Sequence, residues 1–255
     1  MVETQSTGKT ALITGASSGI GAALAHCFAA DSYDVILAAR GVAKMEALGT
    51  ELSQKHAVKV EVIGVDLEVA DGAHKLFGEV KHRGLTLDAL VNNAGYAIYQ
   101  EFKDCDLDAE LKLMQINMAT LVALTRLFLP DLLARKGGVL NVASLAAFQP
   151  GPMWAVYGAT KAFVLSFSEA LAEELSHDGV TVTALCPGIT ASGFEDRAGA
   201  QNSALVKGKR LPTADDVARV GYAAFQHGRR VVVPGVGTVS RLGVRRRSPS
   251  MGMNR

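Results

Sequence analysis

The sequence predicts a single doubly wound α/β domain built on a mainly parallel sheet of about seven strands. Short runs of β-branched and other apolar residues recur along the chain, and stretches of helical length with apolar residues three and four apart lie between most of them. Strands that are apolar on both faces and alternate with helices are typical of a parallel sheet between helical layers. The predicted strands are 11–14, 35–38, 60–65, 89–91, 139–142, 180–185 and 231–233.

Helical periodicity covers five segments, and we expect a further helix after Thr213, whose hydroxyl suits an N-cap. The irregular segment 189–213 is predicted to be a flap that closes over a substrate, because ligands of open α/β sheets bind at the carboxyl ends of the strands. The predicted helices are 19–30, 42–55, 70–83, 109–135 and 154–176.

Composition limits the class of protein. The 255 residues carry a net charge of +1, which argues against a nucleic-acid-binding domain, and the three cysteines suit neither a disulfide framework nor a zinc site. We therefore expect a cytoplasmic protein without a metal. Residues 241–255 hold five arginines and no acid, so residues 1–240 are predicted to form the catalytic domain and the remainder a basic, flexible tail. The apolar stretch 119–133 is interrupted by charged residues and a proline, which disfavours a membrane span.

A glycine-rich turn at 14–21, with the sequence TGASSGIG, joins the first strand to the first helix. Gly15 allows a sharp turn, Gly19 lets the backbone approach a pyrophosphate, and Gly21 lets the helix pack on the strand. The helix N-terminus adds free N–H groups and a positive dipole end. The spacing differs from G-x-G-x-x-G, and a turn of this composition also forms without a ligand, so the motif alone leaves both interpretations open.

The end of the second strand bears on the choice of nucleotide. Arg40 stands where an acid would accept a hydrogen bond from the ribose 2′-hydroxyl of NAD. Its guanidinium suits a 2′-phosphate, to which Lys44 could add charge, so NADP(H) is the expected preference and NAD(H) stays possible. A solvent-facing loop arginine is the alternative. Asp66 after the third strand suits the adenine amino group, although it suits a helix cap equally well.

Tyr157 and Lys161 stand four residues apart on a predicted helix, and therefore share one face. An ammonium beside a phenol favours the phenolate and lowers the phenol pKa, which makes an acid/base pair. Y-x-x-x-K also arises by chance on amphipathic helices. Ser144 follows the fifth strand and can reach the same sheet edge, where its hydroxyl could hold a carbonyl oxygen. It lacks the G-x-S-x-G elbow of a hydrolase nucleophile.

These segments occur in the order found in the short-chain dehydrogenase/reductase family, which the chain resembles over residues 8–235. Besides the turn at 14–21, the resemblance rests on Asn92-Asn93-Ala94-Gly95, Asn117, Ser144, Tyr157-Gly158-Ala159-Thr160-Lys161 and Pro187-Gly188. It is nearest to a general bacterial branch with diverse substrates, and it implies a Rossmann-like fold.

The resemblance also implies a catalytic tetrad. Tyr157 would protonate a carbonyl oxygen that Ser144 orients. Lys161 would hold the nicotinamide ribose and lower the Tyr157 pKa, while Asn117 would fix a water. The expected cofactor-binding residues are Gly15, Ser17, Ser18, Gly19, Ile20, Gly21, Arg40, Asp66, Leu67, Asn93, Gly95, Tyr157, Lys161, Pro187, Gly188, Ile189, Thr190 and Ser192. Ser18 stands where many NADP-using members carry a base, and Ser192 replaces a threonine.

The leading hypothesis is a reversible NADPH-dependent carbonyl reductase, and the alternative is a nucleotide-binding regulatory or scaffold protein without turnover. Helices 109–135 and 154–176 are apolar over more than one face, so a homodimer or homotetramer is expected. Six residues near the catalytic strand ends predict an apolar substrate pocket, unless they fill core or subunit contacts. These are Tyr96, Ile98, Phe148, Pro150, Met153 and Trp154.

Overall fold

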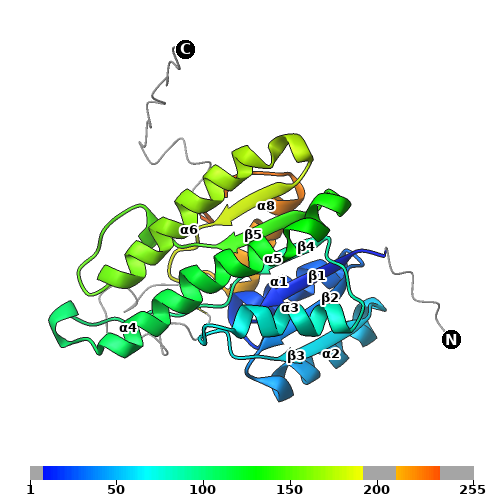
Figure 1. Ribbon diagram of the computed structural model, residues 1–255, viewed down its shortest axis with the longest axis horizontal. Coiled ribbons are helices and arrows are strands. Elements are labelled where there is room, and N and C mark those ends of the chain that lie inside the picture. The colour runs from blue at the N-terminus through cyan, green and yellow to red at the C-terminus, as the bar shows by residue number, and fades with distance from the viewer. Residues whose placement is uncertain (1–7, 192–210, 236–255) are drawn as a thin grey trace, which may run out of the picture.

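A seven-stranded parallel sheet between two layers of helices makes up the computed structural model, which describes residues 8–191 and 211–235 (Figure 1). The strand order is β3-β2-β1-β4-β5-β6-β7, so the chain runs outward from β1 to one edge and then returns to build the other half. The Rossmann-like, doubly wound fold predicted from the sequence is confirmed. Ser192, most of the predicted flap and the basic tail at 241–255 lie outside the described residues.

Each predicted strand is found at its place, with bounds that differ by a few residues. All paired neighbours in the sheet run parallel, as the near-continuous apolar runs indicate for strands buried on both faces. The strands are β1 (Thr10–Thr14), β2 (Asp34–Ala39), β3 (Val60–Gly64), β4 (Ala89–Asn92), β5 (Gly138–Val142), β6 (Thr181–Leu185) and β7 (Val231–Val232).

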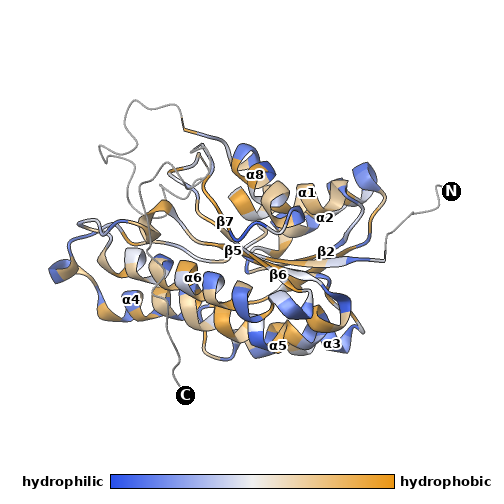
Figure 2. Cartoon of the chain, turned by 90° about the horizontal axis from the view of Figure 1, so that it is seen from above, coloured by the Kyte–Doolittle hydropathy of each residue, from blue (hydrophilic) through white to orange (hydrophobic). Residues whose placement is uncertain are grey.

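The helices divide between the two faces of the sheet. Helices α1, α2 and α8 cover one face, and α3, α4, α5 and α6 cover the other (Figure 2). Thr213 and Asp216 form a capping box at the start of α8, as the position of Thr213 predicts. The helices are α1 (Gly19–Ala30), α2 (Val42–His56), α3 (Gly72–His82), α4 (Leu107–Met114), α5 (Thr120–Arg135), α6 (Ala155–Glu174) and α8 (Ala214–Gln226).

The prediction of one regular helix over 109–135 is wrong in one respect. The segment begins at Leu107, after Asp106 caps it by accepting a hydrogen bond from the Ala109 N–H at 2.8 Å. It also contains a π-helical turn, η2 (Gln115–Ala119), between α4 and α5. A π-turn adds a residue to the helical repeat, and such turns are often found at functional sites. Here the turn carries Asn117.

Taken together, α4, η2 and α5 (Leu107–Arg135) are long and apolar enough to cross a membrane by length and composition alone. One such helix is weak support for a span, because core helices of folded domains pass the same test, and 44% of its most apolar window is buried inside the protein. Charged residues on α5 also have partners within the fold. Asp131 accepts hydrogen bonds from the Lys81 ammonium at 2.6 Å and from the Leu87 N–H at 3.1 Å. This helix therefore packs as part of the core.

A buried polar network links two neighbouring strands, β4 and β5, to the helices on one face of the sheet. The Asn92 amide donates to the Thr125 hydroxyl at 3.0 Å and to the Asn141 carbonyl oxygen at 2.9 Å. The Asn141 amide in turn donates to the Ser168 hydroxyl at 2.9 Å. The network thus joins β4 and β5 to α5 and α6, and α6 is the helix that carries Tyr157 and Lys161.

We expect Asn141→Ala to lower the free energy of unfolding by about 2–4 kcal/mol, because it leaves a cavity and strips the buried Asn92 amide of one acceptor. Urea denaturation followed by circular dichroism measures the loss. Gln54→Ala, which removes an exposed amide on α2, is the matched control and should stay within about 0.5 kcal/mol of the wild type. A loss below about 1 kcal/mol for Asn141→Ala would mean that the network adds little to stability.

Candidate active site

The turn between β1 and α1 has no room for side chains at two of its glycines. Gly15 has a φ of +65°, and a Cβ there would lie 2.8 Å from the Asn93 side-chain nitrogen and 3.0 Å from the Ala94 Cα. A Cβ at Gly21 would collide with the Gly15 carbonyl oxygen. The Asn93 amide holds the turn by donating to the Thr14 carbonyl oxygen at 2.8 Å. The backbone therefore stays close to β4.

This turn fits the pyrophosphate of a dinucleotide. Gly19, the first residue of α1, has a φ of +59°, and the preceding Ser18 is the N-cap, although its side chain does not cap the helix. The first turn of α1 holds no acidic residue. The helix thus begins with N–H donors and the positive end of its dipole, which suit an anion. Ser17 and Ile20, the other residues predicted to contact the cofactor here, lie in the same turn and at the start of the same helix.

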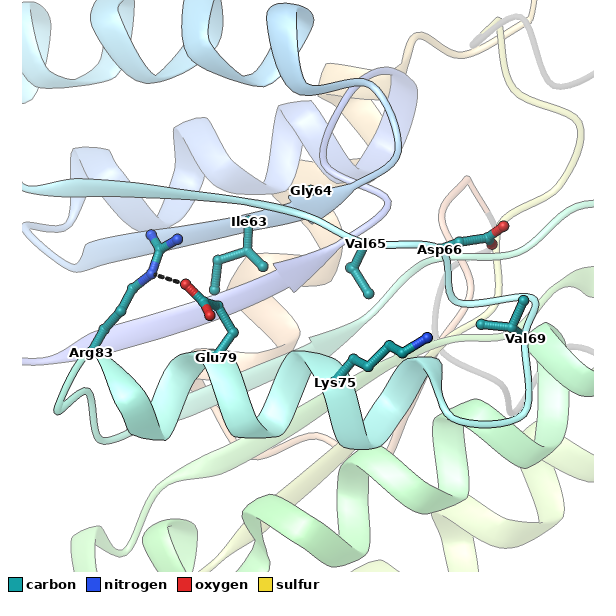
Figure 3. Close-up of a pocket in the computed structure, with 8 residues that line it drawn as sticks. All are labelled: Ile63, Gly64, Val65, Asp66, Val69, Lys75, Glu79 and Arg83. Atoms are coloured by element: carbon teal, nitrogen blue, oxygen red, sulfur yellow. Dashed lines mark hydrogen bonds and ion pairs between the residues drawn. The ribbon is translucent and has the colours of Figure 1, made fainter.

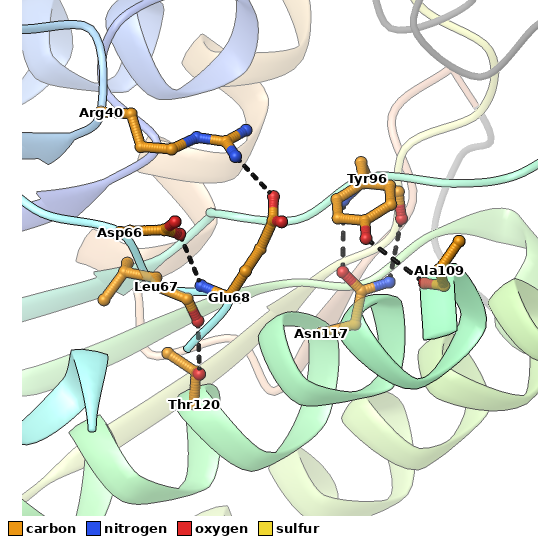
Figure 4. Close-up of polar contacts among 8 residues, drawn as sticks. All are labelled: Arg40, Asp66, Leu67, Glu68, Tyr96, Ala109, Asn117 and Thr120. Carbon is orange, nitrogen blue, oxygen red and sulfur yellow. Dashed lines mark hydrogen bonds and ion pairs between the residues drawn. The ribbon is translucent and has the colours of Figure 1, made fainter. Parts of the chain in front are cut away.

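The residues predicted to recognise the adenosine end lie on neighbouring loops (Figure 4). Arg40 is exposed after β2, and its Nη1 lies 2.8 Å from the Glu68 Oε1. Asp66 accepts a hydrogen bond from the Glu68 N–H at 2.9 Å, and the Leu67 carbonyl accepts one from the Thr120 hydroxyl at 2.8 Å. Asp66 thus shapes its own loop, as the cap alternative implies. Sequence reasoning missed Glu68, which belongs to no motif.

Two of the four predicted catalytic residues touch at the carboxyl edge of the sheet. Ser144 directly follows Ala143 at the end of β5, and its hydroxyl accepts a hydrogen bond from the Ala146 N–H at 3.1 Å. Tyr157 lies in the first turn of α6, with 7% of its surface exposed, and its side chain is hydrogen-bonded to that of Ser144. The pair therefore presents two hydroxyl groups side by side.

Lys161 and Asn117 complete the cluster. Lys161 is buried one turn after Tyr157, with its Nζ 5.8 Å from the centre of the tyrosine ring and donating to the Val142 carbonyl at 2.8 Å. The Asn117 amide donates to the Tyr96 carbonyl at 3.0 Å and to the Thr160 hydroxyl at 3.1 Å. A Cβ at Gly95 would lie 2.6 Å from Asn117 Oδ1 and 3.8 Å from Lys161 Nζ, so glycine lets these side chains approach.

The pKa of Tyr157 is shifted in the direction opposite to the one predicted from the sequence. Burial raises the pKa of Tyr157 to about 12, although its hydrogen bond with Ser144 acts the other way. Burial lowers the pKa of Lys161 to about 8. The expectation that Lys161 brings the phenol pKa toward neutrality is therefore not met in this structure, because burial outweighs the hydrogen bond with Ser144. At neutral pH the phenol keeps its proton and can donate it.

The loop after β6 brings further predicted residues to the same edge. The Pro187 carbonyl accepts a hydrogen bond from the Leu145 N–H at 2.8 Å, which ties this loop to the residue after Ser144. Thr190 is buried, and its hydroxyl donates to the Gly188 carbonyl at 2.9 Å. Ile189 lies between Gly188 and Thr190, and its contact with a nicotinamide stays a prediction.

The predicted apolar pocket residues take different places. Trp154 lies against Tyr157 with ring centres 5.4 Å apart, and Tyr96 and Ile98 pack in the same small cluster. Phe148 packs instead with residues of β6 and α6. Pro150 is exposed, and Met153 has a left-handed backbone with a φ of +65°. The structure thus gathers part of the predicted pocket around the reactive phenol.

A separate hollow of about 460 Å³ lies beside the edge strand β3 (Figure 3). It shares Asp66 with the predicted adenine site, and its lining contains none of the four predicted catalytic residues. Arg83 pairs with Glu79 along one side, and Lys75 pairs with Asp71. Three of its charged side chains, Lys75, Glu79 and Arg83, are thus paired within the fold. Among residues 8–191 and 211–235, no group of three His, Cys, Asp or Glu side chains is placed to hold a metal ion.

Comparison with known proteins identifies a matching family model and relatives of similar sequence. A family model described as short chain dehydrogenase matches residues 9–203. A sulfoacetaldehyde reductase of Chromohalobacter salexigens is 37% identical over 213 residues, which are 81% of this chain and 83% of that protein. A very-long-chain 3-oxoacyl-CoA reductase of Bos taurus is 36% identical over 185 residues, or 71% of this chain. The match spans only 59% of the bovine protein.

The fold has a counterpart among solved structures. A short-chain dehydrogenase from Sphingobium yanoikuyae, determined in complex with NADPH, matches with a TM-score of 0.84 and 31% sequence identity. The match covers 92% of this chain and 91% of that one. The glycine-rich turn at 14–21 and the cluster around Tyr157 both lie within the range matched by the family model.

Proposed function

Because the chain belongs to the short-chain dehydrogenase family, we propose that it is an NAD(P)-dependent oxidoreductase that reduces a ketone or aldehyde reversibly to an alcohol, with NADPH preferred. The observation that carries the proposal is the contact of Tyr157 with Ser144, beside a buried lysine. Two relatives support the direction of the reaction, since their names describe reductases of an oxoacyl-CoA and of an aldehyde.

The chain's own residues would handle the carbonyl oxygen. When bound, a nicotinamide cofactor supplies the hydride that reduces the carbonyl carbon. The Ser144 hydroxyl orients the oxygen, and Tyr157 donates its phenolic proton to it. The Lys161 ammonium stabilises the phenolate that remains, and it can hold the ribose hydroxyls as well. Asn117 bonds to Tyr96 and Thr160 and so fixes the π-turn against α6; the predicted water beside it remains a prediction.

Turnover separates this proposal from a binding protein that lacks catalysis. Purified protein is mixed with NADPH and a panel of ketones and aldehydes with apolar substituents, chosen because Trp154 and Ile98 lie near Tyr157. Loss of NADPH absorbance together with formation of the alcohol, identified by mass spectrometry, is the expected result. A regulatory protein would instead change the fluorescence of NADPH on binding while the cofactor stays unconsumed with every carbonyl compound.

The pH dependence of reduction follows from the two pKa directions. The Tyr157 phenol keeps its proton up to about pH 12, while Lys161, with a pKa of about 8, loses its charge much earlier. We expect kcat/KM for reduction to be level near neutrality and to fall above about pH 8, because the ammonium that stabilises the phenolate is lost. Lys161→Arg keeps the charge and should move the falling limb upward. If kcat/KM of Lys161→Arg falls at the same pH as in the wild type, a group other than Lys161 causes the fall.

We also propose that the chain forms a homodimer or homotetramer through the surface of α4. Leu107 and Leu111 expose 69% and 51% of their surfaces, and Phe102 and Met114 are exposed beside them. Contiguous apolar surface of this kind marks interaction sites. Leu111→Glu should reduce the mass measured by light scattering to that of a smaller assembly, whereas Val220→Glu on α8 should not. A monomeric wild type would contradict this assembly.

A further inference from the structure

One acidic side chain opposes the arginine assigned to the 2′-phosphate. Glu68 is anchored on the loop after β3, and its Oε1 lies 2.8 Å from the Nη1 of Arg40 on the loop after β2 (Figure 4). The two side chains differ in burial, since 18% of the Glu68 side chain is exposed against 65% for Arg40. The carboxylate is thus the fixed partner and the guanidinium the movable one.

The backbone of the Glu68 loop is held from both sides. The Glu68 N–H donates to the Asp66 carboxylate at 2.9 Å, and the carbonyl of the preceding Leu67 accepts a hydrogen bond from the Thr120 hydroxyl of α5 at 2.8 Å. The loop therefore resists displacement. The charges of the pair also reach Tyr96: after burial, which raises the phenol pKa most, Glu68 raises it further and Arg40 lowers it. The Tyr96 N–H in turn donates to the Asn117 Oδ1 at 3.2 Å.

We propose that Glu68 is a cofactor-specificity residue that competes with the 2′-phosphate of NADPH for Arg40 and thereby narrows the preference for NADPH over NADH. The inference rests on the proposed function, which assigns the 2′-phosphate to Arg40. A bound 2′-phosphate must either draw the guanidinium away from Glu68 or share it with a carboxylate of like charge. Both alternatives cost binding free energy for NADPH and leave NADH, which has a neutral 2′-hydroxyl, nearly unaffected.

Glu68 also holds Arg40 in place, and this positioning would strengthen NADPH binding, whereas competition for Arg40 weakens it. Positioning is the weaker effect here, because the guanidinium is mostly exposed and the ion pair joins one Nη1 to one Oε1 rather than forming a two-fold fork. Repulsion between the carboxylate and a phosphate, in contrast, needs no particular geometry. We therefore expect competition to exceed positioning.

The test compares two nucleotide fragments that differ in the 2′-phosphate. Binding of 2′,5′-ADP and 5′-AMP to the full chain is measured by isothermal titration calorimetry, which does not depend on catalysis. Glu68→Gln keeps the shape of the side chain and removes its charge. We expect it to tighten 2′,5′-ADP about three- to tenfold and to change 5′-AMP less than about twofold. Glu173→Gln, which breaks an exposed pair with Arg230 between α6 and the segment before β7, is the matched control and should alter neither affinity.

The outcomes separate this inference from the proposed function. An unchanged or weaker affinity of Glu68→Gln for 2′,5′-ADP overturns the inference, and a weaker one shows that Glu68 positions Arg40. Arg40→Gln tests the shared premise, and it should weaken 2′,5′-ADP. In the double variant Glu68→Gln should tighten 2′,5′-ADP less than it does in the wild type, because only the direct repulsion between carboxylate and phosphate is left to relieve. If Arg40→Gln leaves 2′,5′-ADP affinity unchanged, both assignments fail. If Glu68→Gln binds 2′,5′-ADP more tightly but the protein reduces no carbonyl compound, the inference about Glu68 stands and the proposed reductase activity is rejected.

Discussion

Replacing Tyr157 with Phe should lower kcat for carbonyl reduction by about two to four orders of magnitude, the usual contribution of a positioned general acid. The phenol is buried and protonated at neutral pH, because burial raises its pKa to about 12, and its side chain is hydrogen-bonded to Ser144. Phe keeps the ring that packs against Trp154 and removes the proton. The measurement is steady-state turnover of NADPH with a saturating ketone.

The control is Tyr222→Phe, which removes a hydroxyl that bonds to Asp31 between α8 and the end of α1, away from the catalytic cluster. It should leave kcat within about a factor of two. Cofactor affinity and the melting temperature of Tyr157→Phe should remain close to those of the wild type, since the ring contacts persist. If Tyr157→Phe retains more than about a tenth of the wild-type kcat, another group donates the proton.

The sequence was informative wherever burial decides the structure. Strands such as β1 and β5 are fully or almost fully buried, so their apolar runs can be recognised without neighbours. The shared helix face of Tyr157 and Lys161 could also be predicted from spacing, whereas their assignment with Ser144 and Asn117 to a catalytic tetrad came from the resemblance to the short-chain dehydrogenase/reductase family. Tyr157 and Lys161 are one helical turn apart, and Ser144 follows a strand that ends at the same edge of the sheet. Sheet topology then brings these residues together.

Features that depend on side chains distant in the sequence could not be predicted. The π-turn that carries Asn117 leaves no mark in a pattern of apolar residues three and four apart. The direction of the Tyr157 pKa shift depends on how fully the phenol is desolvated, and residue spacing gives no measure of that. Glu68 illustrates the same limit, because it contacts Arg40 across 28 positions of the chain and occurs in an ordinary polar loop.

Replacing Arg40 with Asp should reverse or abolish a preference for NADPH. The variant loses a charge-assisted contact with the 2′-phosphate and adds a second carboxylate beside Glu68, so the 2′-phosphate meets two negative charges. We expect kcat/KM for NADPH to fall about 30- to 1,000-fold, which corresponds to a loss of about 2–4 kcal/mol of binding free energy. NADH should be little affected or improved, because an aspartate can accept a hydrogen bond from the 2′-hydroxyl.

The ratio of kcat/KM for the two cofactors, measured with one ketone, checks this expectation and cancels effects on the catalytic groups. Arg229→Asp is the matched control, since Arg229 is exposed in the turn before β7 and lies at the opposite edge of the sheet from Tyr157. Arg229→Asp makes the same change of charge as Arg40→Asp. The ratio of kcat/KM for the two cofactors should stay constant, because solvent ions screen most of the effect of a charge at this distant position. An unchanged ratio in Arg40→Asp would mean that another residue contacts the 2′-phosphate or that the enzyme uses NAD. In either case the Arg40–Glu68 ion pair would serve only to join the loops after β2 and β3.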